Sequence, residues 1–582
     1  MVIHPANSLT GGLGRDWPSQ QPTHREEMRF MLKIPATTQK LRGGYYTPEP
    51  IATFLADWAI QAPDTTILEP SCGDGNILEA ALNTLSRKGF LHNKLNEILF
   101  GVEIDALEAD KTFFRVSKHG LARKNIIVGD FFAYCADCIS ENRKFNAIIG
   151  NPPFIRYQHF QEEQRTIAFE IMRHAGLKPS RLTNAWVPFL VASTLLLSEH
   201  GGRIGMVIPA ELLQVNYAAE LRRFLSNHYS KVTLLTFKKL VFQGIQQEVV
   251  LFLGEKSDNN HTGIRVIELD TVEDLIQHQH TDFSLHELRR MDHSKDKWVQ
   301  YFLNQKEIDL LRTLRTNKQI HVTGDLIDVD VGIVTGLNDF FILSDEQLDQ
   351  LKITEFTHPI VTRSAHLQGL RFTEEDFTRN RLQQFSCWLL NIPRNTFSKL
   401  SETIHSYIAF GESMGYNTGY KCRIREEWYV VPSVWIPDAF MLRQIHQYPK
   451  IILNKSGSTS TDTIHRVRMR TQHAPEQLTT AFINSMTFAF TEITGRSYGG
   501  GVLELEPNEA EVLPISIQGM QAIDLEKIHQ LMLSGKIQDA LDYNDKILLS
   551  DGLGLSKNEV SSLRTIWLKL CYRRINRKHV KK

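Results

Sequence analysis

The segment Gly150-Asn151-Pro152-Pro153-Phe154 holds the residue types best suited to chemistry on an amine. An exocyclic aromatic amine is a poor nucleophile because its lone pair is delocalised into the ring. The side-chain oxygen of Asn151 and the carbonyl of Pro152 can accept both amino hydrogens, which frees the lone pair for in-line attack on a sulfonium methyl group. Two successive prolines stiffen this corner by fixing φ at about −65°. We therefore assign catalytic roles to Asn151, Pro152, Pro153 and Phe154, whose ring also offers a stacking face.

A glycine-containing loop at 69–75, Glu-Pro-Ser-Cys-Gly-Asp-Gly, follows a short apolar run and precedes a helical pattern. Glycine permits a tight turn and lets a ligand approach the backbone closely. Open α/β sheets bind ligands at the carboxyl ends of their strands, which is where this loop falls. The loop residues that we assign to a cofactor site are Glu69, Pro70, Cys72, Gly73 and Gly75.

Two further strand ends carry acidic residues. Glu103 can accept hydrogen bonds from both hydroxyls of a ribose, and Asp130 can accept one from an adenine amino group, with the ring of Phe131 stacking beside it. Together with the glycine loop, these residues predict a site for an adenosine-containing cofactor. No G-x-x-x-x-G-K-S/T loop occurs in the sequence, so ATP hydrolysis has no support.

Alternating strand and helix patterns must position these residues. Short apolar runs predict strands at 66–68, 97–102, 125–128, 147–149, 203–208, 232–236 and 248–253. Helical patterns lie between them, at 49–61, 77–88 and 185–199. Such alternation predicts an α/β fold with a parallel, Rossmann-like sheet.

The rest of the chain divides by composition. Residues 1–42 read as an N-terminal arm, and 43–270 as the catalytic domain. A linker with a helical connection is expected at 271–320, and a mixed α+β domain at 321–515. Residues 516–582 return to a helical pattern and end in a basic tail that is expected to contact DNA or to solubilise the chain end. Its cations are Arg573, Arg574, Arg577, Lys578, Lys581 and Lys582.

Bulk composition limits the function classes. The 582 residues carry a formal net charge of zero, which weakly opposes nucleic-acid binding, although a local basic groove suffices for it. Six cysteines give no disulfide framework, and the pair Cys135 and Cys138 lacks the further ligands of a metal site, so no metal is predicted. No signal pattern or apolar run of about 18 residues occurs, and we expect a cytoplasmic protein without membrane contact.

Taken together, these motifs resemble the gamma-class, TaqI-like adenine N6 DNA methyltransferases of restriction–modification systems, over about residues 43–253 and more loosely 320–515. The resemblance implies a class I methyltransferase domain that uses S-adenosylmethionine, followed by a target-recognition domain. It also implies that an early segment lines the methionine end of the cofactor, through Tyr45, Thr47 and Pro48. Phe154 departs from the family, which often has tyrosine there; a phenyl ring keeps the stacking, so we expect activity to survive.

The resemblance further implies how DNA is held. Phe242 matches the family's aromatic residue that stacks on the flipped target base, and a base must leave the duplex for this chemistry. The stretches 335–341, 421–429 and 497–503 resemble the target-recognition half. Plausible phosphate or guanine contacts are Arg423, Arg425, Lys455 and Arg496.

The sequence therefore predicts a monomeric enzyme that methylates adenine N6 in duplex DNA, partnered by a separate endonuclease acting on the same site. Methylation of an RNA base or a protein glutamine, and a non-catalytic DNA-binding subunit, stay open as alternatives. A fused endonuclease is disfavoured because no clear P-D…(D/E)-x-K core is found. Cytosine N4 remains possible as a target, because its amine needs similar acceptors.

Overall fold

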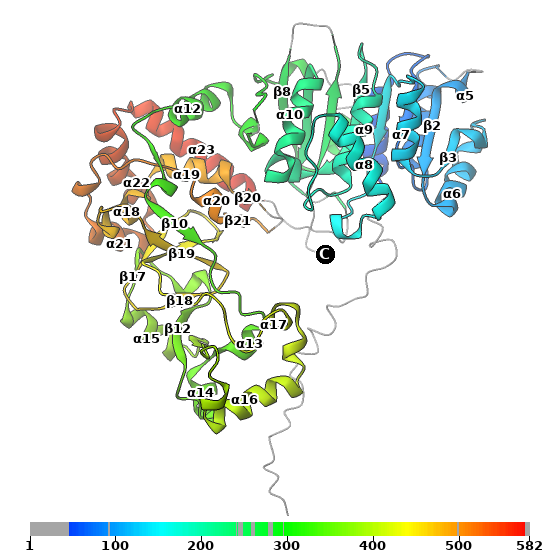
Figure 1. Ribbon diagram of the computed structural model, residues 1–582. Coiled ribbons are helices and arrows are strands. Elements are labelled where there is room, and N and C mark those ends of the chain that lie inside the picture. Colours follow the sequence, from blue (N-terminus) through cyan, green and yellow to red (C-terminus); the bar gives the residue numbers. More distant parts are fainter. Residues whose placement is uncertain are drawn as a thin grey trace, which may run out of the picture.

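The computed structural model describes residues 46–90, 94–239, 241–242, 248–257, 262–277, 283–294, 296–497 and 500–576. Figure 1 shows a lobe built around a large sheet, a C-terminal body beside it, and a distal lobe that extends from the body. The sheet lobe comprises the described residues up to 297. The core of the distal lobe comes from residues between 333 and 360 and between 389 and 431.

The sheet lobe contains eight strands in the order β3-β2-β1-β4-β5-β7-β6-β8. Every strand that the sequence predicts is confirmed within two residues, and β8 is additional. The strands are β1 (Ile67–Glu69), β2 (Leu99–Glu103), β3 (Ile126–Val128), β4 (Ala147–Gly150), β5 (Arg203–Pro209), β6 (Lys231–Phe237), β7 (Val249–Glu255) and β8 (Gly263–Leu269).

The expectation of a parallel sheet is right for β1 to β5 and wrong for β7. Strand β7 runs antiparallel to both β5 and β6, and β8 then pairs with β6 in parallel. The reason is local: only residues 238–248 separate β6 from β7, and a parallel neighbour needs a crossover connection of about a dozen residues or more. The apolar patterns of buried strands do not reveal this reversal, because they read alike in both directions.

Helices cover both faces of the sheet. One face carries α3 (Glu49–Ala59), α4 (Asn76–Arg87) and α6 (Ala106–Ser117) over one apolar cluster. The other carries α7 (Phe131–Ser140), α8 (Glu162–His174), α9 (Trp186–Leu196) and α10 (Ala219–His228) over a second cluster. Helix α9 is buried nearly all round, as its continuous apolar sequence dictates. The predicted helices correspond to α3, α4 and α9, and the other four were not predicted.

Beyond the sheet lobe, the chain forms short strands and helices. A helix α12 (Gln305–Arg315) leads into a five-stranded sheet of β10 (Ile327–Asp330), β19 (Ile464–Met469), β15 (Ala439–Leu442), β17 (Ile451–Asn454) and β13 (Arg371–Phe372). A four-stranded sheet joins β11 (Ile342–Leu343), β14 (Trp388–Leu390), β12 (Thr357–Val361) and β18 (Thr459–Ser460). Around them lie α13 (Asn338–Phe341), α14 (Asp345–Leu351), α15 (Glu374–Leu382), α16 (Glu402–Ser413) and α17 (Tyr420–Arg423).

The C-terminal body is mainly helical. It contains α18 (Pro475–Ala481), α19 (Ser485–Thr494), α20 (Pro507–Ala510), α21 (Leu525–Leu533), α22 (Ile537–Asp545) and α23 (Lys557–Ile575). Five short strands form two small sheets around them: β16 (Gln444–Ile445) and β20 (Arg496–Ser497) flank β21 (Leu503–Glu504), and β9 (His321–Val322) pairs with β22 (Pro514–Ile515). Within the described ranges, the helices lack an apolar stretch of the length that a membrane crossing requires.

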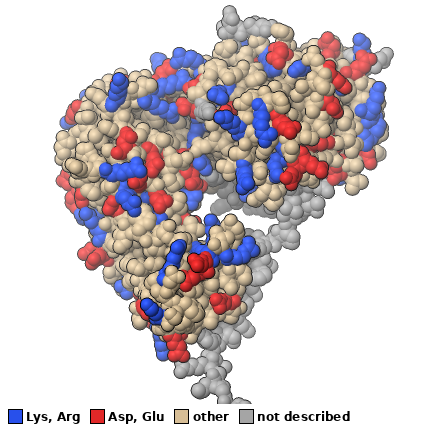
Figure 2. Space-filling view, in the orientation of Figure 1, with Lys and Arg blue, Asp and Glu red and all other residues tan. Residues whose placement is uncertain are grey.

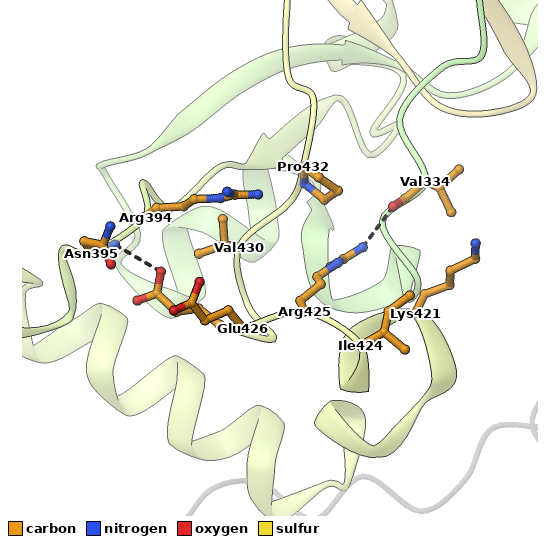
Figure 3. A pocket seen from close by; sticks show the side chains of 10 residues that line it. Val334, Arg394, Asn395, Lys421, Ile424, Arg425, Glu426, Val430 and Pro432 are labelled. Carbon is orange, nitrogen blue, oxygen red and sulfur yellow. Dashed lines mark hydrogen bonds between the residues drawn. The ribbon is translucent and has the colours of Figure 1, made fainter.

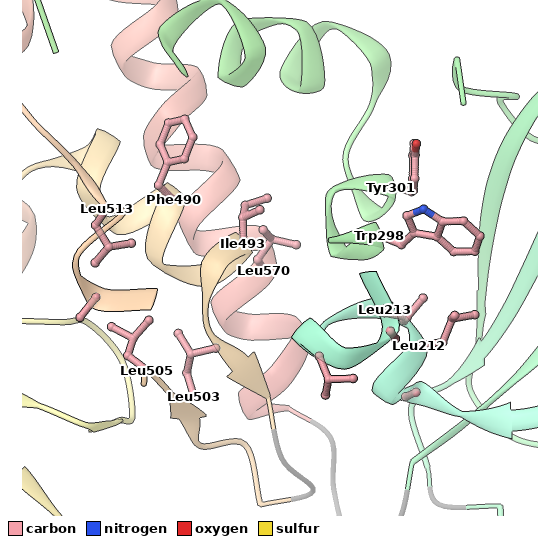
Figure 4. Packing of buried hydrophobic residues seen from close by; sticks show 14 of the residues in the cluster. Leu212, Leu213, Trp298, Tyr301, Phe490, Ile493, Leu503, Leu505, Leu513 and Leu570 are labelled. Atoms are coloured by element: carbon pink, nitrogen blue, oxygen red, sulfur yellow. The ribbon is translucent and has the colours of Figure 1, made fainter. Parts of the chain in front are cut away.

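A continuous apolar core joins the C-terminal body to the sheet lobe. Leu212 of the sheet lobe, Trp298 of the segment that follows it, and Ile493 and Leu570 of the C-terminal body belong to one cluster, which Figure 4 shows at the junction. Polar contacts lock the same junction: the side chain of Gln214 accepts from the backbone N–H of Ser497 at 2.8 Å and donates to its carbonyl. The two parts therefore form a single packed unit.

The expected basic tail is partly wrong. Arg574 is 2% exposed and forms a bidentate ion pair with Glu492, at 2.6 and 2.9 Å. Arg573 pairs with Glu268 of β8 at 2.7 Å, and its guanidinium lies over the ring of Phe302. Both arginines lie on α23, which packs into the body, so neither is a free cation for DNA. The remaining tail cations, Arg577, Lys578, Lys581 and Lys582, lie outside the described residues.

Candidate active site

The glycine loop lies between β1 and α4, as the sequence predicts. Gly75 adopts φ +86° and precedes the first residue of α4, and a Cβ there would lie 3.1 Å from Thr112 of α6. Gly73 also has positive φ, at +52°, but a Cβ on it would meet nothing within 4 Å. The loop is therefore closely backed by α6 at Gly75 and open at Gly73. Cys72 is 3% exposed, with its sulfur turned toward Gly101 of β2.

Glu103 ends β2 beside this loop and braces it. Its carboxylate accepts from the backbone N–H of Gly73 at 2.9 Å and from that of Asp105 at 2.9 Å. Burial raises the pKa of Glu103, while these two hydrogen bonds favour its ionised form. Sequence reasoning missed this bracing role, although an acid one strand away from a glycine turn could have suggested it. The predicted ribose contact stays a prediction.

Glu69 is the most strongly perturbed acid of the site. Its side chain is 2% exposed, and its Oε2 has no hydrogen-bond partner within the part of the chain that the structure describes. Burial, followed by repulsion from Asp74 and Glu103, raises the pKa of Glu69 well above its usual range. A buried carboxylate without a cation is costly, so this position suits a ligand that brings a positive charge.

The proline corner after β4 is tied to both cofactor segments. The side-chain nitrogen of Asn151 donates to the hydroxyl of Thr47 at 3.2 Å, and the hydroxyl of Ser71 donates to the Asn151 carbonyl at 3.3 Å. A Cβ on Gly150 would lie 3.1 Å from the ring of Pro70, so the corner and the glycine loop are in contact. Ser71 and Thr47, which lie 80 and 104 positions from Asn151 in the sequence, thus both bond this residue, one at its backbone carbonyl and the other at its side chain.

The other corner residues are all at least partly buried, and the stacking role of Phe154 stays a prediction. Pro152 is buried and Pro153 half-buried, while Phe154 is half-buried between the two apolar clusters of the sheet lobe. Pro48 is half-buried directly before α3. Tyr45 lies outside the described residues, and its neighbour Tyr46 donates its hydroxyl to Glu108 of α6 at 3.2 Å.

Asp130 and Phe131 are engaged inside the protein. One oxygen of Asp130 caps α7 by accepting from two backbone N–H groups, and the other accepts from the side chain of Gln164 at 2.9 Å. Phe131 is 3% exposed and stacks on Phe189, with 5.1 Å between ring centroids. Each carboxylate oxygen can accept more than one hydrogen bond, so these contacts do not exclude an adenine amino group, and both predictions stay untested.

Phe242 is 6% exposed and packs into the apolar cluster beneath α3 and α4. Residues 243–247 of the same motif lie outside the described residues, as does 240. The stacking of Phe242 on a target base therefore also stays a prediction, and it requires the ring to leave this packing.

Three of the four predicted DNA contacts have protein partners. Arg425 donates to the carbonyls of Val334 and Thr335 at 3.0 and 2.7 Å. Lys455 pairs with Glu476 at 3.0 Å, and Arg496 pairs at 3.0 Å with a buried glutamate at 509. Arg423 alone of the four is exposed without a recorded partner in the described ranges. The sequence shows the charge of an arginine but not the carbonyl or carboxylate that it binds.

Family models identify the chain. Residues 28–321 match the family described as N-6 DNA Methylase, and residues 295–549 match the C-terminal domain of Type II methyltransferase M.Eco57I. The first match covers half of the chain, and the chain belongs to the N-6 DNA Methylase family. It is therefore an enzyme that methylates DNA, and its family implies S-adenosylmethionine as the methyl donor. Membership decides against the RNA, protein and non-catalytic alternatives.

Individual relatives agree with this assignment. The chain is 23% identical to Type II methyltransferase M.XamI of Xanthomonas campestris pv. amaranthicola, over 82% of this chain and 86% of that one. It is 24% identical to Type II methyltransferase M.BanIII of Aneurinibacillus aneurinilyticus, over 56% of this chain and 62% of that one. Among solved structures, the Type IIL restriction–modification enzyme MmeI in complex with DNA shares the fold, with a TM-score of 0.57 and 12% identity over 94% of this chain and 78% of that one.

Proposed function

We propose that this protein is the modification enzyme of a restriction–modification system, which methylates N6 of adenine at one specific sequence in duplex DNA. Its family supports the reaction, and the names of its relatives, Type II methyltransferases, support the biological setting. The observation that carries the residue-level proposal is the hydrogen bond from Asn151 to Thr47. It joins the corner that would hold the amine to the segment that would hold the methyl donor.

The residues around the glycine loop fit S-adenosylmethionine, which supplies an electrophilic methyl group on a sulfonium. Gly73 leaves open space beside the backbone, where a ligand can approach. Glu69 is a buried carboxyl with an unpartnered oxygen, and it would pair with the ammonium of the methionine moiety. Glu103, already ordered by two backbone N–H groups, would accept from the ribose hydroxyls. Thr47 and Pro48 would close the methionine end.

Asn151 would hold the amine through its carboxamide oxygen. A carboxamide has one donating and one accepting end. The Thr47 hydroxyl occupies the donating nitrogen at 3.2 Å, which orients the accepting oxygen for the substrate. The carbonyl of Pro152 would accept the second amino hydrogen. The target base would leave the duplex to reach this corner, with Phe154 and Phe242 as its stacking partners.

Replacement of Asn151 by alanine tests these roles. We expect the variant to lose methyl transfer by about 100-fold or more, because one of two polar groups that stabilise the transition state is removed. Transfer is measured with labelled S-adenosylmethionine and duplex DNA, and cofactor affinity by calorimetry. Affinity should stay within about threefold of wild type, because the corner holds the amine rather than the donor. Loss of cofactor binding in the variant would contradict the assignment.

The proposal extends to partners. We propose a separate endonuclease that cuts the same sequence when it is unmethylated, and a methyltransferase that acts as a monomer on DNA. Protection of methylated DNA from cleavage by extracts of the source organism tests the first part. Light scattering of the protein with and without duplex DNA tests the second, and a mass of two chains per duplex would contradict it.

A further inference from the structure

A pocket opens on the distal lobe, in a region that the proposed chemistry does not use. It has a volume of about 360 Å³ and is formed by the loop around 394, by α17, and by the residues that follow α17. Figure 1 places α17 at the edge of the distal lobe that faces the sheet lobe, and Figure 2 shows the molecule hollowed between these two lobes. The walls are Val334, Arg394, Asn395, Lys421, Ile424, Arg425, Glu426, Glu427, Val430 and Pro432.

Two charged residues of the pocket form its fixed frame. Arg425 donates to three backbone carbonyls, those of Val334, Thr335 and Trp428, at 3.0, 2.7 and 3.3 Å. The carboxylate of Glu427 accepts from the hydroxyl of a tyrosine at 429 and from the backbone N–H at 395, at 2.9 and 3.0 Å. These bonds fix the orientation of both side chains and tie the three walls together.

Three other charged side chains of the pocket form no hydrogen bond or ion pair with the described part of the chain. Arg394 and Glu426 are exposed and have no recorded partner in the described part of the chain. Lys421 is exposed as well, and its only recorded contact there is the face of the Tyr420 ring, at 5.9 Å. Figure 3 shows Arg394 and Lys421 on opposite sides of the pocket, with Arg425 and Val430 between them. The pocket thus offers donors from two sides and one free carboxylate.

We propose that this pocket reads the edge of a base pair in the target sequence, with Arg394, Lys421 and Glu426 as specificity-determining residues. The inference rests on the proposed function, since it concerns the same DNA substrate. Arginine and lysine donate to O6 and N7 of guanine, and glutamate accepts from N4 of cytosine, so the three charges match a G·C pair in the major groove. The rigid frame of Arg425 and Glu427 holds the reading residues in place.

A backbone phosphate is the competing occupant, and the pocket is poorly built for one. The carboxylates of Glu426 and Glu427 line the same pocket and would repel a phosphate. Apolar side chains of Val334, Ile424 and Pro432 form the rest of the wall and suit the flat edge of a base better than a hydrated anion. The two occupants predict different behaviour, because phosphate contacts carry no sequence information.

The test compares the sequences methylated in cells that express the wild-type protein or one of three variants, Arg394→Ala, Lys421→Ala and Glu426→Ala. Sequencing that detects methylated adenine gives the recognition motif of each. Lys399→Ala is the matched control, because this exposed lysine lies on the same loop as Arg394 but does not line the pocket. We expect at least one pocket variant to relax the motif at a single position, with about 10- to 100-fold less discrimination there.

The outcomes separate the inference from the function on which it rests. Relaxation at one position, with the others and the Lys399 control unchanged, supports base reading. A wild-type motif in all three variants overturns this inference and leaves the methyltransferase intact. A uniform loss at all sites, with a shallower dependence of DNA binding on salt, also overturns it in favour of a phosphate contact. Failure of the wild-type protein to methylate DNA would overturn the proposed function itself.

Discussion

The carboxyl edge of the large sheet and the pocket of the distal lobe use polar residues in opposite ways. At the sheet edge, Asn151 and Glu103 are bonded to backbone or side-chain groups that fix their orientation. In the distal pocket, Arg394 and Glu426 are exposed without a recorded partner in the described ranges. The difference fits two tasks: methyl transfer needs groups held in one geometry, and recognition needs groups that remain available to the ligand.

The sheet lobe and the distal lobe also differ in the size and continuity of their apolar cores. The sheet lobe shares a continuous apolar core with the C-terminal body, whereas the distal lobe has a smaller cluster of its own. A change at the sheet edge is therefore expected to alter catalysis sharply. A change at the distal pocket should alter which sequence is chosen, with little effect on the reaction.

The largest effect is expected from Gly75→Val, which should abolish cofactor binding. A side chain at φ +86° is strained, and its Cβ would lie 3.1 Å from the backbone of Thr112, which cannot move aside cheaply. Calorimetry with S-adenosylmethionine measures the loss. Gly89→Val is the control, because this glycine also has positive φ but its Cβ would meet nothing within 4 Å. Equal cofactor affinity in the Gly75→Val and Gly89→Val variants would contradict the assignment of the glycine loop to the cofactor site.

The fold was more predictable than the functions of single side chains. Strand ends and the turn glycines follow from apolar runs and glycine spacing, so the catalytic corner and loop fall where the sequence predicts them. The reversal of β7 has no such signal. Asp130 and Phe131 are predicted to contact a ligand, and the sequence does not reveal that Asp130 also caps α7 or that Phe131 stacks on Phe189, because partners such as Gln164 and Phe189 come from distant segments. The sequence also does not single out Arg394, because the exposure of a side chain depends on the tertiary structure.

A smaller effect is expected from Thr47→Val, which keeps the shape of the side chain and removes the hydroxyl that holds Asn151. We expect the rate of methyl transfer at saturating cofactor to fall about tenfold, because the carboxamide loses its fixed orientation. Single-turnover kinetics measure the rate. Thr47→Ser should restore most of it, and a serine variant as slow as the valine variant would argue for a purely structural role.

Glu69→Gln should remove the pH dependence of cofactor affinity. Burial raises the pKa of Glu69, so at low pH the free protein holds this carboxyl protonated. The ammonium of bound S-adenosylmethionine favours the ionised form of Glu69. The affinity of the wild-type protein for this cofactor therefore rises with pH until Glu69 is ionised in the free protein. It weakens as the pH falls through the raised pKa of Glu69. Calorimetry across this range should give a flat profile for the variant. The exposed Glu49→Gln control should keep the wild-type slope, and an unchanged slope in Glu69→Gln would refute the pairing.

The smallest effect is expected from Arg425→Ala. This variant tests whether Arg425 stabilises the pocket or contacts DNA directly. Loss of its three carbonyl contacts should destabilise the distal lobe by about 1–3 kcal/mol. Hydrogen exchange of peptides between 333 and 431 measures this, and peptides of the sheet lobe should be unaffected. Arg423→Ala, an exposed neighbour on α17, should leave exchange unchanged. Unchanged exchange in Arg425→Ala would return this residue to the set of candidate DNA contacts.

The account depends most on the link between Thr47 and Asn151, and a double-mutant cycle on methyl transfer tests it directly. Single-turnover rates are compared for wild type, Thr47→Val, Asn151→Ala and the double variant at saturating S-adenosylmethionine. If Thr47 acts by orienting Asn151, the valine substitution should have no further effect once the carboxamide is gone. Losses that simply add in the double variant would show that the two residues act independently, and would contradict the proposed catalytic corner.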